Sequence, residues 1–436
     1  MRKILILTAS FGDGHNAAAR SVRQALELAE PEASVEVLDL FDSTYGRLNR
    51  FFMKAYRGVV RYAPALWSRL YSGFDNPALF QRQLRRLGKL REAMGVLLQQ
   101  KQPDVIVSTY PVYSHLIAAL FGEELNRPFR LITVITDSIS VCSAWYLAPG
   151  DFFVVADELT AEVLRQGGVA AEQIKTLGFP VSPAFARERP APLARPGTGQ
   201  PPKVLYVINT GKPLAGRSLD QLLRIKGLQL TITTGRSAPL KTKLERRLRD
   251  FGQRVRVYGW TDEMPELLMS HHLLIGKAGG ALVHEAMAAR CPMIINQVIP
   301  GQEEGNARLV ETLGGGAVAA KQDFANLVKQ AFDGNARLWQ QWRNNLERAS
   351  QPDSALRVAD LILSQFPPAP HECGVRPAPC SPKTGKGLRS FRRPPPEQEA
   401  RALARVLAGA LRLYCAAEQV AWAPKSSRAE LVWLRS

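Results

Sequence analysis

Short apolar runs alternate with helical patterns through most of the chain, and this alternation constrains the fold more than any other feature. In the first half the strand-like runs are 4–8, 35–38, 105–108, 131–136 and 152–156. A second series has runs at 204–208, 228–233, 255–257, 273–275 and 293–296. Strands that alternate with helices build parallel sheets covered by helices. We therefore expect an α/β fold of two doubly wound, Rossmann-like domains that face a central cleft, with ligands at the carboxyl ends of the strands.

A proline- and glycine-rich stretch separates the two series. We predict a first domain at 1–186, a linker at 187–202 and a second domain at 203–366. After residue 366 the composition changes to Pro, Arg and Gly, and we expect 367–436 to be a basic, poorly ordered tail. The chain has 436 residues, 46% of them hydrophobic, which is enough for two separate cores.

The charge balance favours an anionic partner. The net charge is +18, and the excess is concentrated in 45–101 and in the tail. Such a surface attracts nucleic acid, an anionic membrane or phosphorylated substrates. Aromatic rings beside cations in 45–101 suit the lipid headgroup layer, whereas no recognisable nucleic-acid-binding motif is present. We predict an anionic membrane surface as a partner, no nucleic acid, and membrane contact by Phe51, Phe52, Lys54, Arg57, Trp67 and Arg69.

The cysteines and the apolar runs indicate a compartment. Five cysteines form neither a paired framework nor a metal-binding spacing, which favours a reducing environment. The first apolar run is too short for a signal-peptide core, and no stretch is long enough to cross a bilayer. We expect a cytoplasmic protein, or a peripheral one on the cytoplasmic face of a membrane.

A glycine loop with a histidine follows the first predicted strand. Residues 10–15 read SFGDGH, and Gly12 and Gly14 allow a tight turn and close approach of the backbone to a ligand. His15 then stands at the start of a predicted helix, where unpaired N–H groups can meet an acceptor or an anion. An imidazole that titrates near neutrality suits acid–base chemistry. A plain strand-to-helix turn with an incidental histidine is the alternative on this motif alone.

A second glycine motif follows the strand predicted at 273–275. Gly279 and Gly280 lead into a helix that carries Glu285. Such a turn presents backbone amides and a positive helix end to phosphate oxygens, and a carboxylate one turn later can accept hydrogen bonds from ribose hydroxyls. The motif predicts a seat for a nucleotide diphosphate. Its alternative is a glycine turn with a solvated Glu285.

A polar cluster follows the last predicted strand of the second series. Residues 300–307 read PGQEEGNA and include Gln302, Glu303 and Asn306. Amide and carboxylate groups at the end of a strand suit the several hydroxyls of a sugar. The alternative is an ordinary polar start of a helix.

These three motifs, in this order, resemble those of the monogalactosyldiacylglycerol synthases and processive diacylglycerol glucosyltransferases. That family is related to the lipid-II-forming N-acetylglucosaminyltransferase. The resemblance covers about residues 3–365 and rests on SFGDGH at 10–15, KAGG at 277–280 with Glu285, and PGQE at 300–303 with Asn306. It implies a GT-B fold and an inverting transfer of a hexose, galactose or glucose, from a UDP-sugar to diacylglycerol. The first domain would receive the lipid acceptor, and the second would hold the UDP-sugar donor.

The resemblance also implies roles for single residues. His15 matches the proposed base, and Asp137 and Trp145 match an acceptor-side aspartate and tryptophan, beside the loop residues Gly12, Asp13 and Gly14. Glu285 matches the carboxylate that holds the ribose, and Gln302 and Glu303 match the pair that faces the donor sugar. The remaining donor-binding candidates are Gly211, Gly235, Arg236, Trp260, Thr261, Lys277, Gly279, Gly280 and Asn306. We expect no cofactor and no essential metal, because no clear Asp-x-Asp pair is present and the glycine-loop amides can stabilise the diphosphate.

Two departures from the family pattern leave alternatives open. Cys142 stands where the family has a histidine, and the loop 209–216 carries fewer glycines than usual. The chain could instead be an idle UDP-sugar-binding module on a membrane. It could also act on a polyprenyl or lipid A type acceptor, or as a UDP-sugar epimerase. For Asp137, the alternative to a role in catalysis is a helix cap.

Overall fold

The computed structural model describes residues 2–49, 53, 58–59, 80, 84–122, 127–187, 193–196, 201–208, 217–301, 303–319 and 324–366. The six predicted membrane residues, Gly211 with the loop 209–216, Gln302 and the tail 367–436 all lie outside these residues. Both sheets described below belong to one compact unit, Met1–Pro368.

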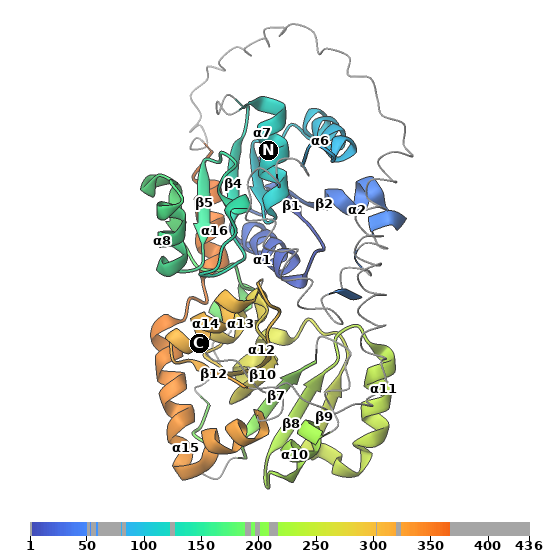
Figure 1. The fold of residues 1–436 in the computed structure, drawn as a ribbon, viewed down its shortest axis with the longest axis vertical. Coiled ribbons are helices and arrows are strands. Elements are labelled where there is room, and N and C mark those ends of the chain that lie inside the picture. Colours follow the sequence, from blue (N-terminus) through green and yellow to red (C-terminus); the bar gives the residue numbers. More distant parts are fainter. Residues whose placement is uncertain are drawn as a thin grey trace, which may run out of the picture. The chain divides into compact units, whose positions relative to one another are not determined.

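The first half forms a parallel six-stranded sheet in the order β2-β1-β3-β4-β5-β6 (Figure 1). Its strands are β1 (Lys3–Thr8), β2 (Ser34–Asp39), β3 (Val105–Ser108), β4 (Arg130–Val134), β5 (Phe152–Val155) and β6 (Ile174–Thr176). Its helices are α1 (Asp13–Ala29), α2 (Leu40–Tyr45), α6 (Gly88–Lys101), α7 (Pro111–Phe121), η2 (Ser143–Trp145), α8 (Glu158–Gln166), η3 (Ala171–Gln173) and α9 (Ala184–Arg187). β1 pairs with β2 from Lys3↔Ser34 to Thr8↔Asp39, and with β3 on its other edge. The strand order therefore reverses between β1 and β3, which is where such sheets bind ligands.

The second half forms another parallel sheet, in the order β12-β11-β10-β7-β8-β9. Its strands are β7 (Lys203–Val207), β8 (Gln229–Thr233), β9 (Val255–Tyr258), β10 (Leu273–Lys277), β11 (Met293–Gln297) and β12 (Gly316–Val318). Its helices are α10 (Arg217–Arg224), α11 (Ala238–Arg247), η4 (Arg249–Arg254), α12 (Met264–Ser270), α13 (Gly280–Ala288), α14 (Glu304–Thr312) and α15 (Phe324–Ala349), followed by α16 (Ser354–Leu363). The helical backbone of α15 is interrupted at 333–336. Here the strand order reverses between β7 and β10, so both predicted doubly wound sheets are confirmed.

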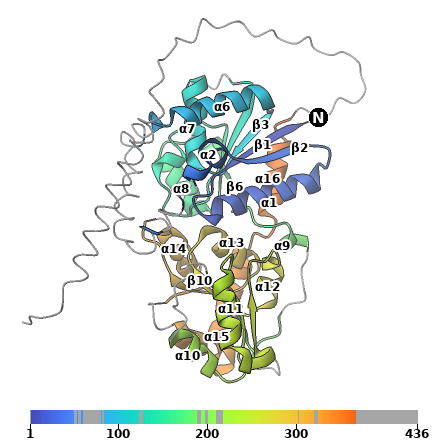
Figure 2. The same cartoon turned by 90° about the vertical axis from the view of Figure 1, so that its right-hand side faces the viewer.

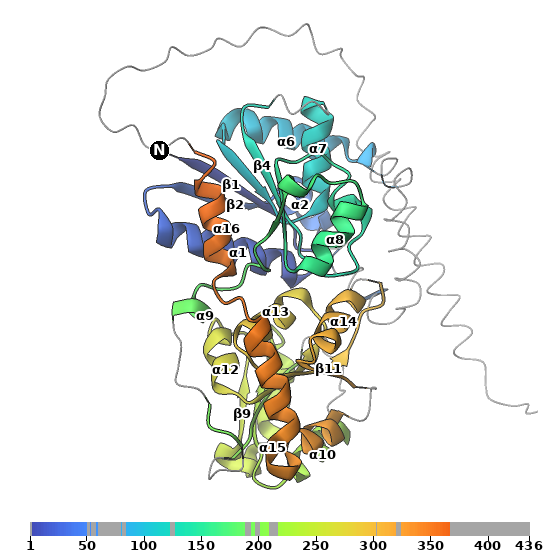
Figure 3. The same cartoon turned by 90° about the vertical axis from the view of Figure 1, so that its left-hand side faces the viewer.

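The strands are apolar on both faces because helices cover both faces. In β1, Leu5 and Leu7 pack in a core with residues of α6 and α7, while Ile4 and Ile6 face the opposite layer with residues of α1 and α16. Figures 2 and 3 show these two layers of helices on either side of the first sheet. Full burial of each such side chain contributes roughly 1.5–3 kcal/mol. The run Ile4–Leu7 therefore fixes the centre of the first sheet.

The boundaries between the halves differ from those predicted. The apolar face of α16, with Ala355, Val358, Ala359 and Ile362, packs in the core of the first sheet, although the prediction placed residues up to 366 in the second domain. Likewise, Phe179 and Phe185 precede the predicted boundary at 186 but pack with apolar residues of the second half. The spacing of apolar residues identifies a face that must be buried, but it does not identify the sheet that buries it.

Candidate functional site

His15 stands at the start of α1, directly beyond the carboxyl end of β1. The helix is preceded by Gly12, whose φ of 129° strains any residue with a Cβ, so the glycine is required for this turn. The His15 side chain is 8% exposed, and its Nδ1 lies 2.8 Å from Thr136 Oγ1. Its ring meets Tyr110 edge-on, with 5.1 Å between the ring centroids. The predicted position of His15 at the start of a helix is confirmed, and its ring contacts Thr136 and Tyr110.

The imidazole of His15 is neutral at ordinary pH. Burial lowers the pKa of His15 to about 4, and a hydrogen bond to the backbone of Thr109 opposes this shift only in part. A neutral ring keeps a lone pair that can accept a proton. A ring with this pKa is a weak base at neutral pH in the free protein, so the predicted role of His15 as the general base stays a prediction.

Asp137 and Trp145 form a hydrogen-bonded pair next to His15. Trp145 Nε1 donates to Asp137 Oδ2 at 2.7 Å, and the Trp145 ring lies 5.9 Å from the His15 ring. Burial raises the pKa of Asp137 to about 6, while the bond from Trp145 lowers it. The N-cap of η2, the next helix along the chain, is Cys142. The helix-cap alternative for Asp137 is therefore wrong for that helix.

Cys142, which stands where the family pattern has a histidine, is a buried residue. Its side chain is buried in the apolar core of the first half, close to Ala144 and Trp145. The nearby carbonyl of Ala144 lies 2.8 Å from Nε2 of His115, another buried imidazole. Cys142 is thus a buried core residue of the first half.

The second glycine motif leaves a helix N-terminus open. Gly279 precedes α13, no side chain of the described residues caps the helix, and no acidic residue stands in its first turn. The first amide N–H groups of such a helix have no partner within the helix and carry partial positive charge. The ammonium of Lys277 lies beside them, since a Cβ placed on Gly279 would be 3.1 Å from Lys277 Nζ. The ammonium of Lys277 and the start of α13 thus lie side by side at the end of β10, together with the Glu303 carboxylate that pairs with Lys277.

Glu303 forms an ion pair with Lys277. One carboxylate oxygen accepts a hydrogen bond from the Lys277 ammonium, and the other accepts one from the Ile299 N–H at 3.1 Å. The residue is only 4% exposed. Both oxygens are thus engaged within the protein, and the predicted contact of Glu303 with a donor sugar stays a prediction.

Asn306 offers a buried hydrogen-bond acceptor. Its Nδ2 donates to the carbonyl of Ala278 at 3.0 Å and lies 3.7 Å from the position of a Cβ on Gly280. Its Oδ1 is buried and accepts no hydrogen bond from the described residues. An unpaired buried acceptor costs about 1–3 kcal/mol and marks a place where a donor group is missing.

Glu285 lies on α13 and faces α1 of the first half. Burial raises the pKa of Glu285 to about 7, Arg20 lowers it and Asp13 raises it further. Both of these residues belong to α1. The carboxyl group is therefore held between the two halves, next to the glycine loop that carries His15.

The remaining predicted donor residues lie at the ends of β8 and β9. Gly235 has a φ of 54°, and the next residue, Arg236, places its guanidinium 5.3 Å from the centre of the Trp260 ring. The Trp260 side chain is 53% exposed, and Thr261 Oγ1 accepts a hydrogen bond from the Glu263 N–H. An exposed aromatic ring at a strand end can stack on a planar group.

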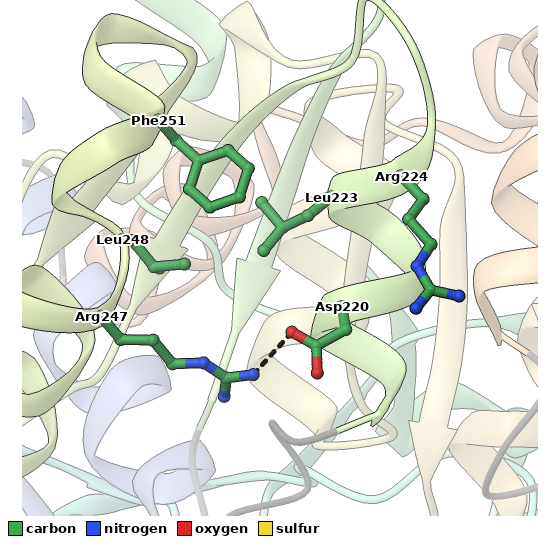
Figure 4. Close-up of a pocket in the computed structure, with 6 residues that line it drawn as sticks. All are labelled: Asp220, Leu223, Arg224, Arg247, Leu248 and Phe251. Atoms are coloured by element: carbon green, nitrogen blue, oxygen red, sulfur yellow. Dashed lines mark hydrogen bonds and ion pairs between the residues drawn. The ribbon is translucent and has the colours of Figure 1, made fainter.

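A pocket on the second half lies apart from these residues. It has a volume of about 460 Å³ and lies between α10, α11 and η4 (Figure 4). It is lined by Asp220, Leu223, Arg224, Arg247, Leu248 and Phe251. The ion pair between Arg247 and Asp220 spans it at 2.6 Å. None of its residues was predicted for the site, and we assign it no part in the chemistry.

The two sets of predicted residues meet through one segment of the first half. The carbonyl oxygen of Thr136 lies 2.8 Å from the position of a Cβ on Gly280, so the backbone beside His15 contacts the start of α13. Ser138 Oγ lies 2.9 Å from Nε2 of His284. Thr136, Ser138 and His284 were missed by sequence reasoning. The only local signal was that they adjoin the predicted residues Asp137 and Glu285.

Two parallel sheets, each with a glycine turn at its reversal point, define a two-domain glycosyltransferase fold of the GT-B class. The crystal structure of MurG from Acinetobacter baumannii shares it, with a TM-score of 0.54 at 14% identity, covering 83% of this chain and 99% of that chain. Residues 15–181 match the family model for monogalactosyldiacylglycerol synthase, and residues 214–358 match that for the glycosyltransferase family 28 C-terminal domain.

Two curated relatives are similar to this chain over most of its length. The chain is 24% identical to a processive diacylglycerol beta-glucosyltransferase of Bacillus cytotoxicus, over 83% of this chain and 94% of the relative. It is 28% identical to the chloroplastic monogalactosyldiacylglycerol synthase of Spinacia oleracea, over 82% of this chain and 71% of the relative. The first half of the chain thus matches the monogalactosyldiacylglycerol synthase family, the second half matches the glycosyltransferase family 28 C-terminal domain, and the chain resembles monogalactosyldiacylglycerol synthases and processive diacylglycerol glucosyltransferases over most of its length.

Proposed function

We propose that this protein transfers a hexose from a UDP-sugar to the free hydroxyl of diacylglycerol, with inversion at the anomeric carbon. The names of its relatives support this substrate pair. The observation that carries the proposal is the contact between Thr136, which touches His15, and Gly280 at the open start of α13. It brings a proton acceptor and an anion-binding helix end to one place, as transfer to an alcohol requires.

His15 acts as the base in this proposal. The acceptor oxygen attacks the anomeric carbon, its proton passes to the neutral imidazole, and the bond from that carbon to the diphosphate breaks. Thr136 holds the ring through its hydroxyl. The carboxylate of Asp137, next in the chain, favours the imidazolium that forms. Proton transfer of this kind contributes roughly 10²–10⁴-fold to a rate.

The second half stabilises the departing diphosphate. The amides at the start of α13 and the Lys277 ammonium lie where negative charge would accumulate. Glu303 positions Lys277, the unpaired Oδ1 of Asn306 accepts a sugar hydroxyl, and Glu285 accepts the ribose hydroxyls. These groups act without a cofactor or an essential metal in this proposal. Retained activity in excess EDTA supports this assignment, and loss that magnesium restores overturns it.

The protein binds an anionic membrane from the cytoplasmic face as a peripheral protein. No helix in the described ranges is both long and apolar enough to span a bilayer. Exposed cations, among them Lys89 and Arg91, stand at the start of α6. The exposed side chains of Val96 and Leu120 lie on α6 and the neighbouring α7. Cations beside apolar groups bind anionic headgroups.

Co-sedimentation tests this membrane proposal. We expect binding to vesicles with anionic lipid and little binding to neutral vesicles. Lys89→Glu with Arg91→Glu should reduce it several-fold. The matched control, Lys243→Glu with Arg246→Glu on α11 of the second half, makes the same change in charge and should not. Equal loss in both double variants would show that only the net charge matters.

One assay tests the reaction itself. Purified protein is incubated with anionic vesicles that contain diacylglycerol and with labelled UDP-glucose, UDP-galactose or UDP-N-acetylglucosamine, and the lipids are separated. A labelled glycosyldiacylglycerol supports the proposal and identifies the sugar. Label on an added polyprenyl phosphate instead indicates another lipid acceptor. UDP binding by calorimetry without transfer to any lipid indicates an idle module.

A further inference from the structure

The segment 136–140 links the predicted catalytic residues to the donor-binding helices. On one side Thr136 contacts His15, and Asp137 accepts the hydrogen bond from Trp145. On the other side Ser138 lies 2.9 Å from Nε2 of His284 on α13. Both of these side chains are buried. The same five residues therefore contact both parts of the site.

Helix α14 also presses on this segment. A Cβ on Gly305 would lie 1.9 Å from the carbonyl oxygen of Ser138, so the two backbones are in direct contact. Only a residue without a side chain fits there, because no L residue tolerates such an approach. The segment is thus enclosed by both helices that carry the donor motifs.

The backbone of the segment is strained. Ile139 has a φ of 59°, which a β-branched residue adopts only under constraint. Its N–H donates to Thr160 Oγ1 at 3.0 Å. Such a conformation persists only where surrounding contacts hold it. Loss of a neighbouring contact would let the segment relax and move the adjacent Asp137.

His284 is itself fixed in place. Its ring stacks on Phe179, with centroids 4.9 Å apart and planes inclined by 3°. The carbonyl of Phe179 accepts a hydrogen bond from Ser354, which is fully buried. The imidazole is therefore a rigid partner for Ser138.

We propose that His284 and Ser138 are positioning residues for glycosyl transfer, whose hydrogen bond fixes Thr136 and Asp137, and through them His15, against the donor helix α13. The inference rests on the function proposed above. Neither residue touches the reacting atoms. Misplacement of a catalytic group by about 1 Å can cost 10²-fold in rate.

Kinetics separate this role from general stability. We expect Ser138→Ala and His284→Ala each to lower kcat roughly 10- to 100-fold, with UDP affinity within about 2-fold. The matched control is Ser364→Ala, the same substitution at the end of α16 and outside the linking segment, where the exposed hydroxyl donates to the carbonyl of Leu361. It should keep kcat within about 2-fold, as surface contacts contribute little.

Two further variants complete the kinetic test. His284→Gln places an amide near the former Nε2 and should restore part of kcat. The double variant Ser138→Ala with His284→Ala should be no slower than the slower single variant, because both remove one interaction. Unchanged kcat in both single variants, or losses that multiply in the double variant, would overturn the proposal.

A spectroscopic measurement does not depend on the identity of the reaction. The protein is labelled with 5-fluorotryptophan, and the ¹⁹F line of Trp145 is assigned with Trp145→Phe. We expect this line to shift or broaden in Ser138→Ala and His284→Ala, and to stay in place in Ser364→Ala. An unmoved line in all three variants overturns the positioning role, even if the wild type transfers sugar. A moved line without transfer to diacylglycerol supports the role and refutes the assigned reaction.

Discussion

The two sheets place glycine turns at equivalent points, but the first turns of the helices that follow differ in charge. Helix α1 begins with Asp13 in its first turn, and a buried neutral imidazole stands beside it. Helix α13 has no acid in its first turn, and Lys277 lies next to it. An acid satisfies the positive end of a helix, whereas an open end attracts an anion. The comparison teaches that the charge of the first turn, rather than the fold, separates the predicted acceptor side from the donor side.

Removal of the imidazole should have the largest effect. We expect His15→Ala to lower kcat by roughly 10²–10⁴-fold, the usual contribution of a general base. UDP affinity should stay within about 2-fold, because the donor groups lie on the other half. Stopped assays with labelled UDP-sugar measure the first quantity, and calorimetry measures the second. A variant that keeps near-normal turnover removes His15 from the catalytic role.

Removal of the cation should affect the donor side instead. We expect Lys277→Met to weaken UDP binding by roughly 10- to 100-fold, since a hydrogen bond to a charged group contributes about 1.5–3 kcal/mol. The substitution also leaves Glu303 buried without its partner, which destabilises the fold. The double variant with Glu303→Gln controls for this by removing the unpaired charge. If that double variant binds UDP normally, Lys277 does not contact the diphosphate.

A smaller loss of affinity is expected from the carboxylate on α13. Glu285→Ala should weaken UDP binding by about 10-fold through the lost ribose contact, with kcat at saturating donor nearly unchanged. Calorimetry with UDP and with uracil distinguishes the sites, because uracil has no ribose. An equal loss for both ligands, or no loss for UDP, contradicts the assignment.

The pH dependence should show which acidic group supports His15. Asp137, with a pKa of about 6, loses its negative charge as the pH falls through 6, so the wild-type rate should fall there. His15, with a pKa of about 4, stays neutral over that range. Asp137→Asn should therefore be roughly 10-fold slower and should lack the decline near pH 6. A decline that persists in the variant assigns it to another group.

Most of the fold could be predicted because its strands are continuous apolar runs such as Ile4–Leu7. Two strands were not predicted, β6 and β12, since each has three residues and is partly exposed. The sheet against which α16 packs could not be predicted either, because the apolar face of a helix does not indicate which core buries it. Contacts between residues that are distant in sequence determine the two short strands and the position of α16.

The positions of the predicted site residues in the fold could be predicted as far as the motifs extend along the chain. His15, Asp137, Lys277 and the glycines lie at the expected strand ends and helix starts. The pairing of Glu303 with Lys277 and the contact of His284 with Ser138 join residues that are distant in sequence. No local pattern encodes such contacts, so only the folded structure reveals them.

The return of α16 to the first sheet ties the two halves together twice. The chain leaves the first sheet through Phe179 and comes back at Ser354, and Ser354 bonds the backbone of the outgoing segment at Phe179 and Val181. A recombinant donor half cut at residues 203 and 366 would expose the apolar face of α16, and the isolated acceptor half would lose the part of the layer over Ile4 and Ile6 that α16 supplies. The structure contains two separate sheets, but no single cut in the chain separates them, because α16 follows the second sheet in sequence and packs on the first.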